Sequence, residues 1–354
     1  MVNGVTNQRI LESTRDRIGE HLRRIDLLTS RDLRNIENSC SLELRNGKRD
    51  PNDAFSIALW VEECEKLQQN PILFYKQQGK EHSILKDDDF CIIVMNTFQK
   101  QMIRKFPRII TIDSTHGLNG YDFQMTTIMV LDDFHHGFPL AEMFSNRKDT
   151  VVYRLFFTEV REEVGVVFSK FFMSDMAECF FNGWLEVMGE GNASYPQHLF
   201  CSWHVDHAWQ SNLTKISDRE KRSEIYKILK NLQQETPMLQ FTSALTNALA
   251  YICNNEKTRN FGEYFKKNYA HNFRKWAYCF RVEAGINTNM HLESMHKVIK
   301  YFYLERKTVK RLDKGLNAEL KFVRDKSVER IIRLTKGEHT KQTRFLSQNH
   351  KEVL

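Results

Sequence analysis

The chain has 354 residues, of which 41% are hydrophobic and 12% aromatic, a composition that excludes intrinsic disorder and suits a protein with a substantial core. The formal net charge of +7 is compatible with an acidic partner, and no apolar run approaches the ~18 residues that a membrane span needs. The seven cysteines are odd in number and show no paired spacing, which indicates free thiols in a reducing compartment.

The first part of the chain, residues 1–106, is expected to be mainly helical. Asp53 is interpreted as an N-cap, because apolar residues recur at helical spacing after it until Pro71. Residues 72–75 should be short and extended, and residues 79–89 form a charged loop. Residues 90–106 are interpreted as a helix, with a strand followed by a helix as the alternative.

The pattern changes at residue 108, where β-branched residues from Ile109 to Ile112 predict a strand covered on both faces. The expected elements are strands at 108–114, 123–132 and 138–144, a helix at 150–164 capped by Asp149, a strand at 168–174, a helix at 176–188 and a strand at 198–203. Three consecutive strands followed by this alternation predict a mixed sheet in an α/β fold, with a meander joined to parallel strands.

The last part of the chain is expected to be helical and basic. Residues 204–285 and 287–303 show helical spacing, and residues 304–341 form a basic helical stretch. Residues 297–341 contain 14 Lys or Arg and six Asp or Glu, which accounts for the whole positive excess. Such a segment is either a nucleic-acid-binding surface or a solvated helix face, and composition leaves both interpretations open.

Three acidic residues stand out by their positions. Asp113 ends the first predicted strand of the sheet, Asp175 follows the fourth, and Glu293 lies on the helix at 287–303. If those strands are neighbours, the two aspartates lie side by side at the carboxyl ends, where open α/β sheets bind ligands. Close carboxylates repel each other and attract a hard cation such as Mg²⁺ or Mn²⁺. The alternative is that Asp113 only caps the following turn.

The order β-β-β-α-β-α-β, followed by a helical region and an acidic helix, resembles the ribonuclease H-like catalytic domain of Mutator-like (MULE) DDE transposases. The matching sequences lie within residues 108–303 and are I-D-S-T-H-G at 112–117, S-D-M-A-E at 174–178, C-S-W-H at 201–204 and N-x-x-x-E-S-x-H at 289–296. The resemblance implies a mixed five-stranded sheet with a helical insertion before the last catalytic helix.

The resemblance also implies how the chain is organised. The expected parts are a helical region for DNA binding or dimerisation at 1–106, the first part of the ribonuclease H-like core at 107–206, a helical insertion at 207–286, the final core helix at 287–303 and a basic helical tail at 304–354. Aromatic residues of the insertion, including Trp209, Phe273 and Trp276, are expected to form a core and not to stack on bases.

The family's catalytic triad falls on Asp113, Asp175 and Glu293, which would bind two Mg²⁺ or Mn²⁺ ions. The activity implied is that of a DNA transposase, in which water cleaves a phosphodiester at the transposon end and the freed 3′-hydroxyl attacks target DNA. The implied partners are DNA and a second copy of the chain, as a homodimer or higher oligomer, with no membrane. The implied location is the nucleus.

Further candidates for contacts with DNA or with the triad lie beside these acids. They are His116, Asn119, Cys201, His204, Asn289 and Lys297. Turn stabilisation explains Asn119 equally well. Zinc at Cys201 and His204 is disfavoured, because structural zinc needs four ligands and no second pair is visible. A buried, hydrogen-bonded histidine near the acids is the preferred interpretation of His204.

The sequence differs from the pattern of the family, and these differences leave two other functions as alternatives. Its N-terminal zinc-finger module and C-terminal SWIM module are not visible, and no cysteine follows Cys279. We therefore expect a catalytic core with flanks, in which DNA recognition would fall to the helical N-terminal region and to the basic segment. The alternatives are a host-retained, transposase-derived DNA-binding or interaction protein without catalysis, and a stand-alone ribonuclease H-like nuclease.

Overall fold

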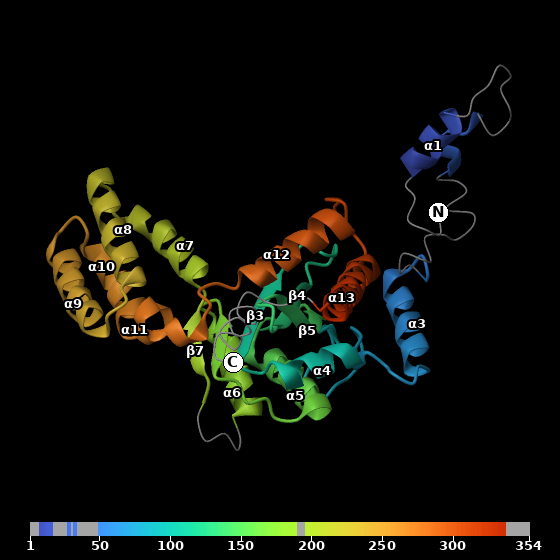
Figure 1. Ribbon diagram of the computed structural model, residues 1–354, viewed down its shortest axis with the longest axis horizontal. Coiled ribbons are helices and arrows are strands. Elements are labelled where there is room, and N and C mark those ends of the chain that lie inside the picture. The colour runs from blue at the N-terminus through green and yellow to red at the C-terminus, as the bar shows by residue number, and fades with distance from the viewer. Residues whose placement is uncertain (1–6, 17–26, 30, 34–48, 190–194, 338–354) are drawn as a thin grey trace, which may run out of the picture.

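The computed structural model describes residues 7–16, 27–29, 31–33, 49–189 and 195–337. At its centre is a seven-stranded sheet in the order β1-β2-β5-β4-β3-β6-β7 (Figure 1). The strands are β1 (Ile72–Lys76), β2 (Cys91–Val94), β3 (Ile109–Thr115), β4 (Gln124–Leu131), β5 (Gly137–Ser145), β6 (Phe171–Ser174) and β7 (Gln197–Phe200). Strands β3, β4 and β5 form an antiparallel meander, whereas β6 runs parallel to β3 and β7 runs parallel to β6.

Helices cover both faces of this sheet and extend beyond it. They are α1 (Asn7–Arg15), α3 (Asp53–Glu65), α4 (Thr97–Lys105), α5 (Thr150–Val164), α6 (Glu178–Met188), α7 (Ser202–Asn212), α8 (Arg219–Gln234), α9 (Met238–Asn254), α10 (Arg259–Phe265), α11 (Phe273–Trp276), α12 (Met290–Val298) and α13 (Leu312–Thr335). A π-helical turn, η7 (Ile299–Tyr303), continues α12. The predicted mixed α/β architecture with helical flanks is confirmed.

Two sequence-based predictions about the sheet were wrong. It has seven strands and not five, because residues 72–76 pair with residues 91–94, and residues 91–94 pair in turn with β5. Residues 90–106 are a strand followed by a helix, since Cys91–Val94 are buried between two neighbouring strands while Asn96 begins α4 with a capping box to Gln99. The N-terminal region is therefore not purely helical.

Smaller boundaries also differ from the prediction. Asn52, and not Asp53, is the N-cap of α3. Asp53 instead accepts hydrogen bonds from the backbone N–H groups of Leu312 and Asp313, at 2.5 and 3.1 Å, which attaches α3 to the start of α13. Residues 304–311 connect η7 to α13 without forming a helix, and residues 338–354 lie outside the described part of the chain.

The two faces of the sheet bury different side chains. Ile110 and Ile112 of β3 point into the cluster that packs under α4, α5 and α6 (Figure 1). The intervening residues Thr111, Asp113 and Thr115 share the opposite face, which α3, α12 and α13 cover. The period of two in β3 therefore directs Asp113 toward the helix that carries Glu293.

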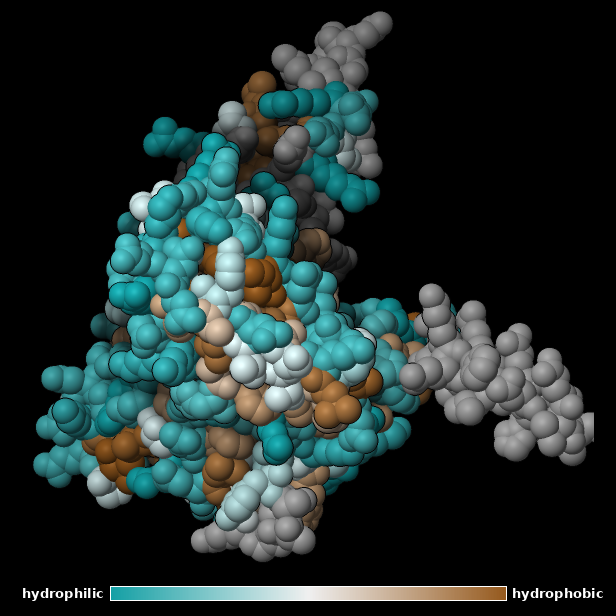
Figure 2. Space-filling model, turned by 90° about the vertical axis from the view of Figure 1, so that its left-hand side faces the viewer, coloured by the Kyte–Doolittle hydropathy of each residue, from teal (hydrophilic) through white to brown (hydrophobic). Residues whose placement is uncertain are grey.

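Helices α7 to α11 form a block beside the end of the sheet, with a hydrophobic cluster of its own. Trp209 and Trp276 are fully buried there, and Phe273 packs against them partly buried, so the expectation that these aromatic residues form a core is confirmed. Figure 2 shows that hydrophilic residues dominate the face of the molecule on this side and that apolar residues form several separate patches. None of the helices in the described ranges combines the length and apolar character needed to cross a membrane.

Candidate active site

The pairing of β3 with β6 brings two of the predicted acids together. The parallel register aligns Ile109 with Phe171 and Thr111 with Met173. Continued beyond these pairs, the same register puts Asp175, the residue after the end of β6, opposite Asp113, and the charge of Asp175 acts on the carboxyl group of Asp113. Asp175 also accepts a hydrogen bond from the N–H of Ala177 at 2.9 Å, which fixes the turn into α6.

Helix α12, which covers the sheet face that carries Asp113, supplies the third acidic residue, Glu293. Glu293 is half-buried, and its Oε1 is buried with no hydrogen-bond partner. Burial raises the pKa of Asp113 to about 7; the N–H of Ser114 opposes this rise, and the charges of Asp175 and Glu293 add to it. Asp175 and Glu293 are therefore both close enough to Asp113 for their charges to disfavour its ionised form.

The junction between β7 and α7 adds a thiol and an imidazole to this site. Cys201 is fully buried, its Sγ donates to Asn289 Oδ1 at 2.9 Å, and its backbone N–H donates to the carbonyl of Ser174 at 2.8 Å. Burial lowers the pKa of His204, while the nearby charges of Asp175 and Glu293 act to raise it. Asn289 also lies close enough to Asp113 to lower the pKa of its carboxyl group.

A buried arginine holds this junction in place. The guanidinium of Arg281 donates to the carbonyls of Phe200 and Asn287 at 2.7 and 3.1 Å and to Ser202 Oγ at 3.0 Å. The end of β7, the start of α7 and the segment before α12 are thereby fixed to one side chain. Arg281 is only 1% exposed, so these acceptors replace the water that the charge would otherwise need.

Two overlapping groups of residues could bind a metal ion. The carboxylates of Asp113, Asp175 and Glu293 are hard oxygen ligands, and the charges of Asp175 and Glu293 add to the rise in the pKa of Asp113 that burial causes, although the ligand atoms of the three acids do not all lie within 4.8 Å of one another. In the second group, Cys201 Sγ, a ring nitrogen of His204 and a carboxylate oxygen of Glu293 all lie within 4.8 Å of one another. Glu293 belongs to both groups.

Three other residues that the sequence predicts for the site, His116, Asn119 and Lys297, do not belong to either of these two groups. His116 is on the β3–β4 turn, where its Nδ1 contacts Asp122 Oδ1 at 3.1 Å. The side chain of Asn119 is used by the same turn, because it donates to the carbonyl of Phe123 at 2.8 Å and accepts from the N–H groups of Tyr121 and Phe123. Lys297 is exposed on α12, one turn after Glu293.

Sequence analysis did not single out Arg281 or Lys300. Lys300, on η7, donates from its Nζ to Thr115 Oγ1 at 2.6 Å, at the end of the strand that carries Asp113. Its spacing of seven residues from Glu293 places both on one face of a helix, and this spacing was the available signal. Arg281 gave no such signal, since an isolated arginine in a helical region has no distinctive pattern.

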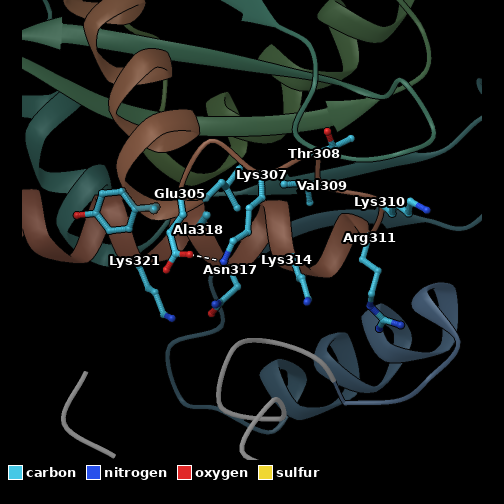
Figure 3. A pocket seen from close by; sticks show the side chains of 12 residues that line it. Glu305, Lys307, Thr308, Val309, Lys310, Arg311, Lys314, Asn317, Ala318 and Lys321 are labelled. Atoms are coloured by element: carbon cyan, nitrogen blue, oxygen red, sulfur yellow. Dashed lines mark hydrogen bonds and ion pairs between the residues drawn. The ribbon is translucent and has the colours of Figure 1, made fainter. Parts of the chain in front are cut away.

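The basic segment forms a groove next to the β3–β4 turn. Figure 3 shows the groove, of about 630 Å³, between the 304–311 connection and α13. Five of its lining residues are basic and one, Glu305, is acidic; the basic ones are Lys307, Lys310, Arg311, Lys314 and Lys321. Lys307 pairs with Glu305, and Arg311 pairs with Asp313. The N–H of Gly120 donates to the carbonyl of Lys310 at 3.0 Å, so the groove adjoins the turn that follows Asp113.

Comparison with known proteins identifies one part of the chain. The family model described as the RNaseH-like domain of zinc finger SWIM domain-containing proteins 1 and 3 matches residues 73–180. This stretch runs from β1 into α6 and includes Asp113 and Asp175, whereas Cys201, His204 and Glu293 lie beyond it. No curated protein matches the chain. The matched stretch and the mixed sheet together show that the chain carries a ribonuclease H-like domain.

Proposed function

We propose that this chain is a metal-dependent DNA transposase of the DDE type, which cleaves transposon ends and joins the 3′-hydroxyl to target DNA. The observation that supports the proposal is the parallel pairing of β3 with β6, which, continued beyond Thr111 and Met173, puts Asp175 opposite Asp113, while the charges of Asp175 and Glu293 both act on Asp113. Acidic groups at the carboxyl ends of adjacent strands, with a third acid on a covering helix, are the arrangement that two-metal phosphoryl transfer needs.

In this proposal the chain's own residues hold and orient the reacting groups. Asp113, Asp175 and Glu293 would bind two Mg²⁺ or Mn²⁺ ions, which supply Lewis acidity at the phosphodiester when bound. Asn289 positions Cys201 relative to Asp113, and Arg281 keeps the β7–α7 junction in place. Lys297 is exposed and offers a charge to DNA phosphate. A homodimer that holds two DNA ends, the five-part division of the chain and a nuclear location belong to the same proposal.

A retained DNA-binding protein without catalysis is the second candidate. The observation that favours it is the basic groove, whose lysine and arginine side chains would attract phosphate without any contribution from Asp113, Asp175 or Glu293. The proximity of Glu293 to Cys201 and His204 also supports the second candidate. A Glu293 carboxylate that is held by these two residues would not bind a metal ion together with Asp113 and Asp175.

Metal-dependent nicking and strand transfer test the two candidates directly. The full chain is incubated with DNA that carries the terminal sequences of the transposon that encodes it. Parallel reactions contain Mg²⁺, Mn²⁺ or a chelator. The transposase proposal expects cleavage with either ion, none with the chelator and none in Asp175→Asn. A folded protein that binds DNA without cleaving it under any of these conditions supports the second candidate and contradicts the first.

Reversing two charges in the groove should weaken binding to duplex DNA. We expect the double variant Lys310→Glu and Lys314→Glu to lower the slope of log affinity against log salt by about 2, because each lost phosphate contact removes about 0.9. Fluorescence anisotropy at several NaCl concentrations measures this slope. Lys227→Glu on α8 reverses an exposed lysine in the separate helical block and should change the slope by less than half as much. Equal effects from the two variants would show that the groove has no special role.

A further inference from the structure

We propose that Cys201, His204 and Glu293 form a zinc site beside the two aspartates. Their Sγ, ring nitrogen and carboxylate oxygen lie within 4.8 Å of one another. Tetrahedral zinc holds nitrogen and sulfur ligands ~3.5 Å apart, so small side-chain rotations suffice to close the three ligands around an ion. The ligands come from the β7–α7 junction and from α12, which Arg281 and the hydrogen bond from Ser202 N to the carbonyl of Asn287 hold together.

Two of the three ligands carry buried atoms that no protein group satisfies. His204 Nδ1 and Glu293 Oε1 are buried without a hydrogen-bond partner. Each such atom costs about 1–3 kcal/mol if it stays unsatisfied, so neither is expected at this position without a reason. A bound cation satisfies the carboxylate oxygen directly, and it satisfies the imidazole where Nδ1 is the nitrogen that it takes as its ligand.

The position of Cys201 suits a thiolate ligand. It occupies the N-cap position of α7, where the helix dipole favours negative charge. The N–H of Asn289 points at the sulfur at 3.5 Å, so it can remain there once the proton has left.

The ligand atoms of Cys201, His204 and Glu293 favour Zn²⁺ over the Mg²⁺ or Mn²⁺ ions that are proposed for Asp113 and Asp175. A thiolate and an imidazole are ligands for Zn²⁺, whereas Mg²⁺ prefers oxygen ligands in octahedral geometry. Three protein ligands leave the fourth tetrahedral position to water. The site therefore differs in chemistry from the paired aspartates, although it uses the same glutamate.

Sharing Glu293 gives zinc a regulatory effect, and this consequence rests on the proposed function. A Glu293 carboxylate that binds zinc is drawn away from Asp113 and Asp175, so zinc should inhibit Mg²⁺-dependent cleavage. Cys201→Ser should relieve this inhibition, because serine is a poor zinc ligand that retains a hydrogen-bond donor for Asn289.

Cobalt absorption tests the site without any cleavage assay. Titration of the full chain with Co²⁺ should produce a thiolate-to-cobalt charge-transfer band that saturates at one ion per chain. The band should disappear in Cys201→Ser and weaken in His204→Ala, and zinc affinity from competition with a chromophoric chelator should fall by at least about tenfold in both. Cys253→Ser and His207→Ala are the matched controls and should keep both signals.

Three outcomes decide the inference. No saturable band in the folded wild-type chain, or a band that survives Cys201→Ser, overturns the zinc site. If Cys201→Ser fails to fold, His204→Ala and Glu293→Gln decide instead, because unchanged zinc affinity in both contradicts the site. Asp175→Asn should keep the cobalt band even where cleavage is lost. Failure of the zinc site is therefore distinguishable from failure of the transposase proposal.

Discussion

Replacing Asp113 by Asn should stabilise the metal-free protein at pH 8 by up to about 4 kcal/mol while it lowers metal-dependent cleavage by at least about 10³-fold. Burial, opposed by the N–H of Ser114 and reinforced by Asp175 and Glu293, raises the pKa of Asp113 to about 7. In the unfolded chain the same carboxyl has a pKa of about 4. A difference of roughly three pKa units, at 1.36 kcal/mol each, sets the upper limit of the stabilisation.

The sign of the pH dependence follows from the raised pKa. Between pH ~4 and ~7 the folded protein holds a proton on Asp113 that the unfolded chain has lost, so the stability of the wild type falls as pH rises. Below pH ~4 both states are protonated, and above pH ~7 both are ionised, so the contribution is constant outside this window. The variant cannot titrate at this position and should show a flatter profile.

Urea unfolding from pH 4 to pH 8, with and without Mg²⁺, measures both parts of this prediction. Without metal, Asp113→Asn should be the more stable protein at pH 8 and should match the wild type more closely at pH 4. Added Mg²⁺ should stabilise the wild type but not the variant, because metal binding favours the native state. Equal stability of the two proteins at pH 8 without metal would contradict the raised pKa of Asp113, which burial causes and the charges of Asp175 and Glu293 increase.

Replacing Glu319 by Gln should stabilise the protein at pH 9 by about 1–4 kcal/mol without altering cleavage. Glu142 on β5 and Glu319 on α13 are both fully buried, and the charge of Glu142 acts on Glu319. Burial raises the pKa of Glu142 to about 8, although Gln99 donates to both of its carboxylate oxygens, at 3.2 and 3.0 Å. Burial and the neighbouring Glu142 hold the pKa of Glu319 well above its usual range.

This pair contributes stability only while it retains its protons. The contribution is complete below pH ~4.3, the unfolded value, and is lost as pH rises through the raised pKa values. A glutamine at position 319 carries no charge at any pH, so only Glu142 still has to ionise and the loss of stability above neutral pH should become smaller. Differential scanning calorimetry between pH 5 and pH 9 measures the change.

Glu329→Gln is the matched control on the same helix. Glu329 is only partly buried and pairs with Lys326 and Arg333 near the surface, so its replacement should change stability by about 1 kcal/mol or less at every pH. If Glu319→Gln lowers the stability at pH 9, the buried carboxyl group of Glu319 does not destabilise the folded protein at that pH, and the prediction is wrong.

Local sequence patterns predicted most of the elements that follow residue 108, together with their order along the chain. β-branched runs and the Asp149 cap predicted the meander and the helix at 150–164, because local periodicity and capping depend on neighbouring residues. The same patterns placed Asp113 and Asp175 at the ends of strands. They failed at residues 90–106, where a short apolar run suits either a strand or a helix and only burial between β1 and β5 decides.

The tertiary structure alone decided which side chains meet. The register of β3 against β6, continued beyond the paired residues, put Asp175 opposite Asp113, and the crossing of α12 brought Glu293 to both the aspartates and the Cys201–His204 pair. Arg281, Lys300 and the Glu142–Glu319 pair have no sequence signature comparable in strength, because their partners are distant along the chain. Such contacts follow from packing across the sheet, where burial and unpaired charge set the energies that local sequence patterns do not encode.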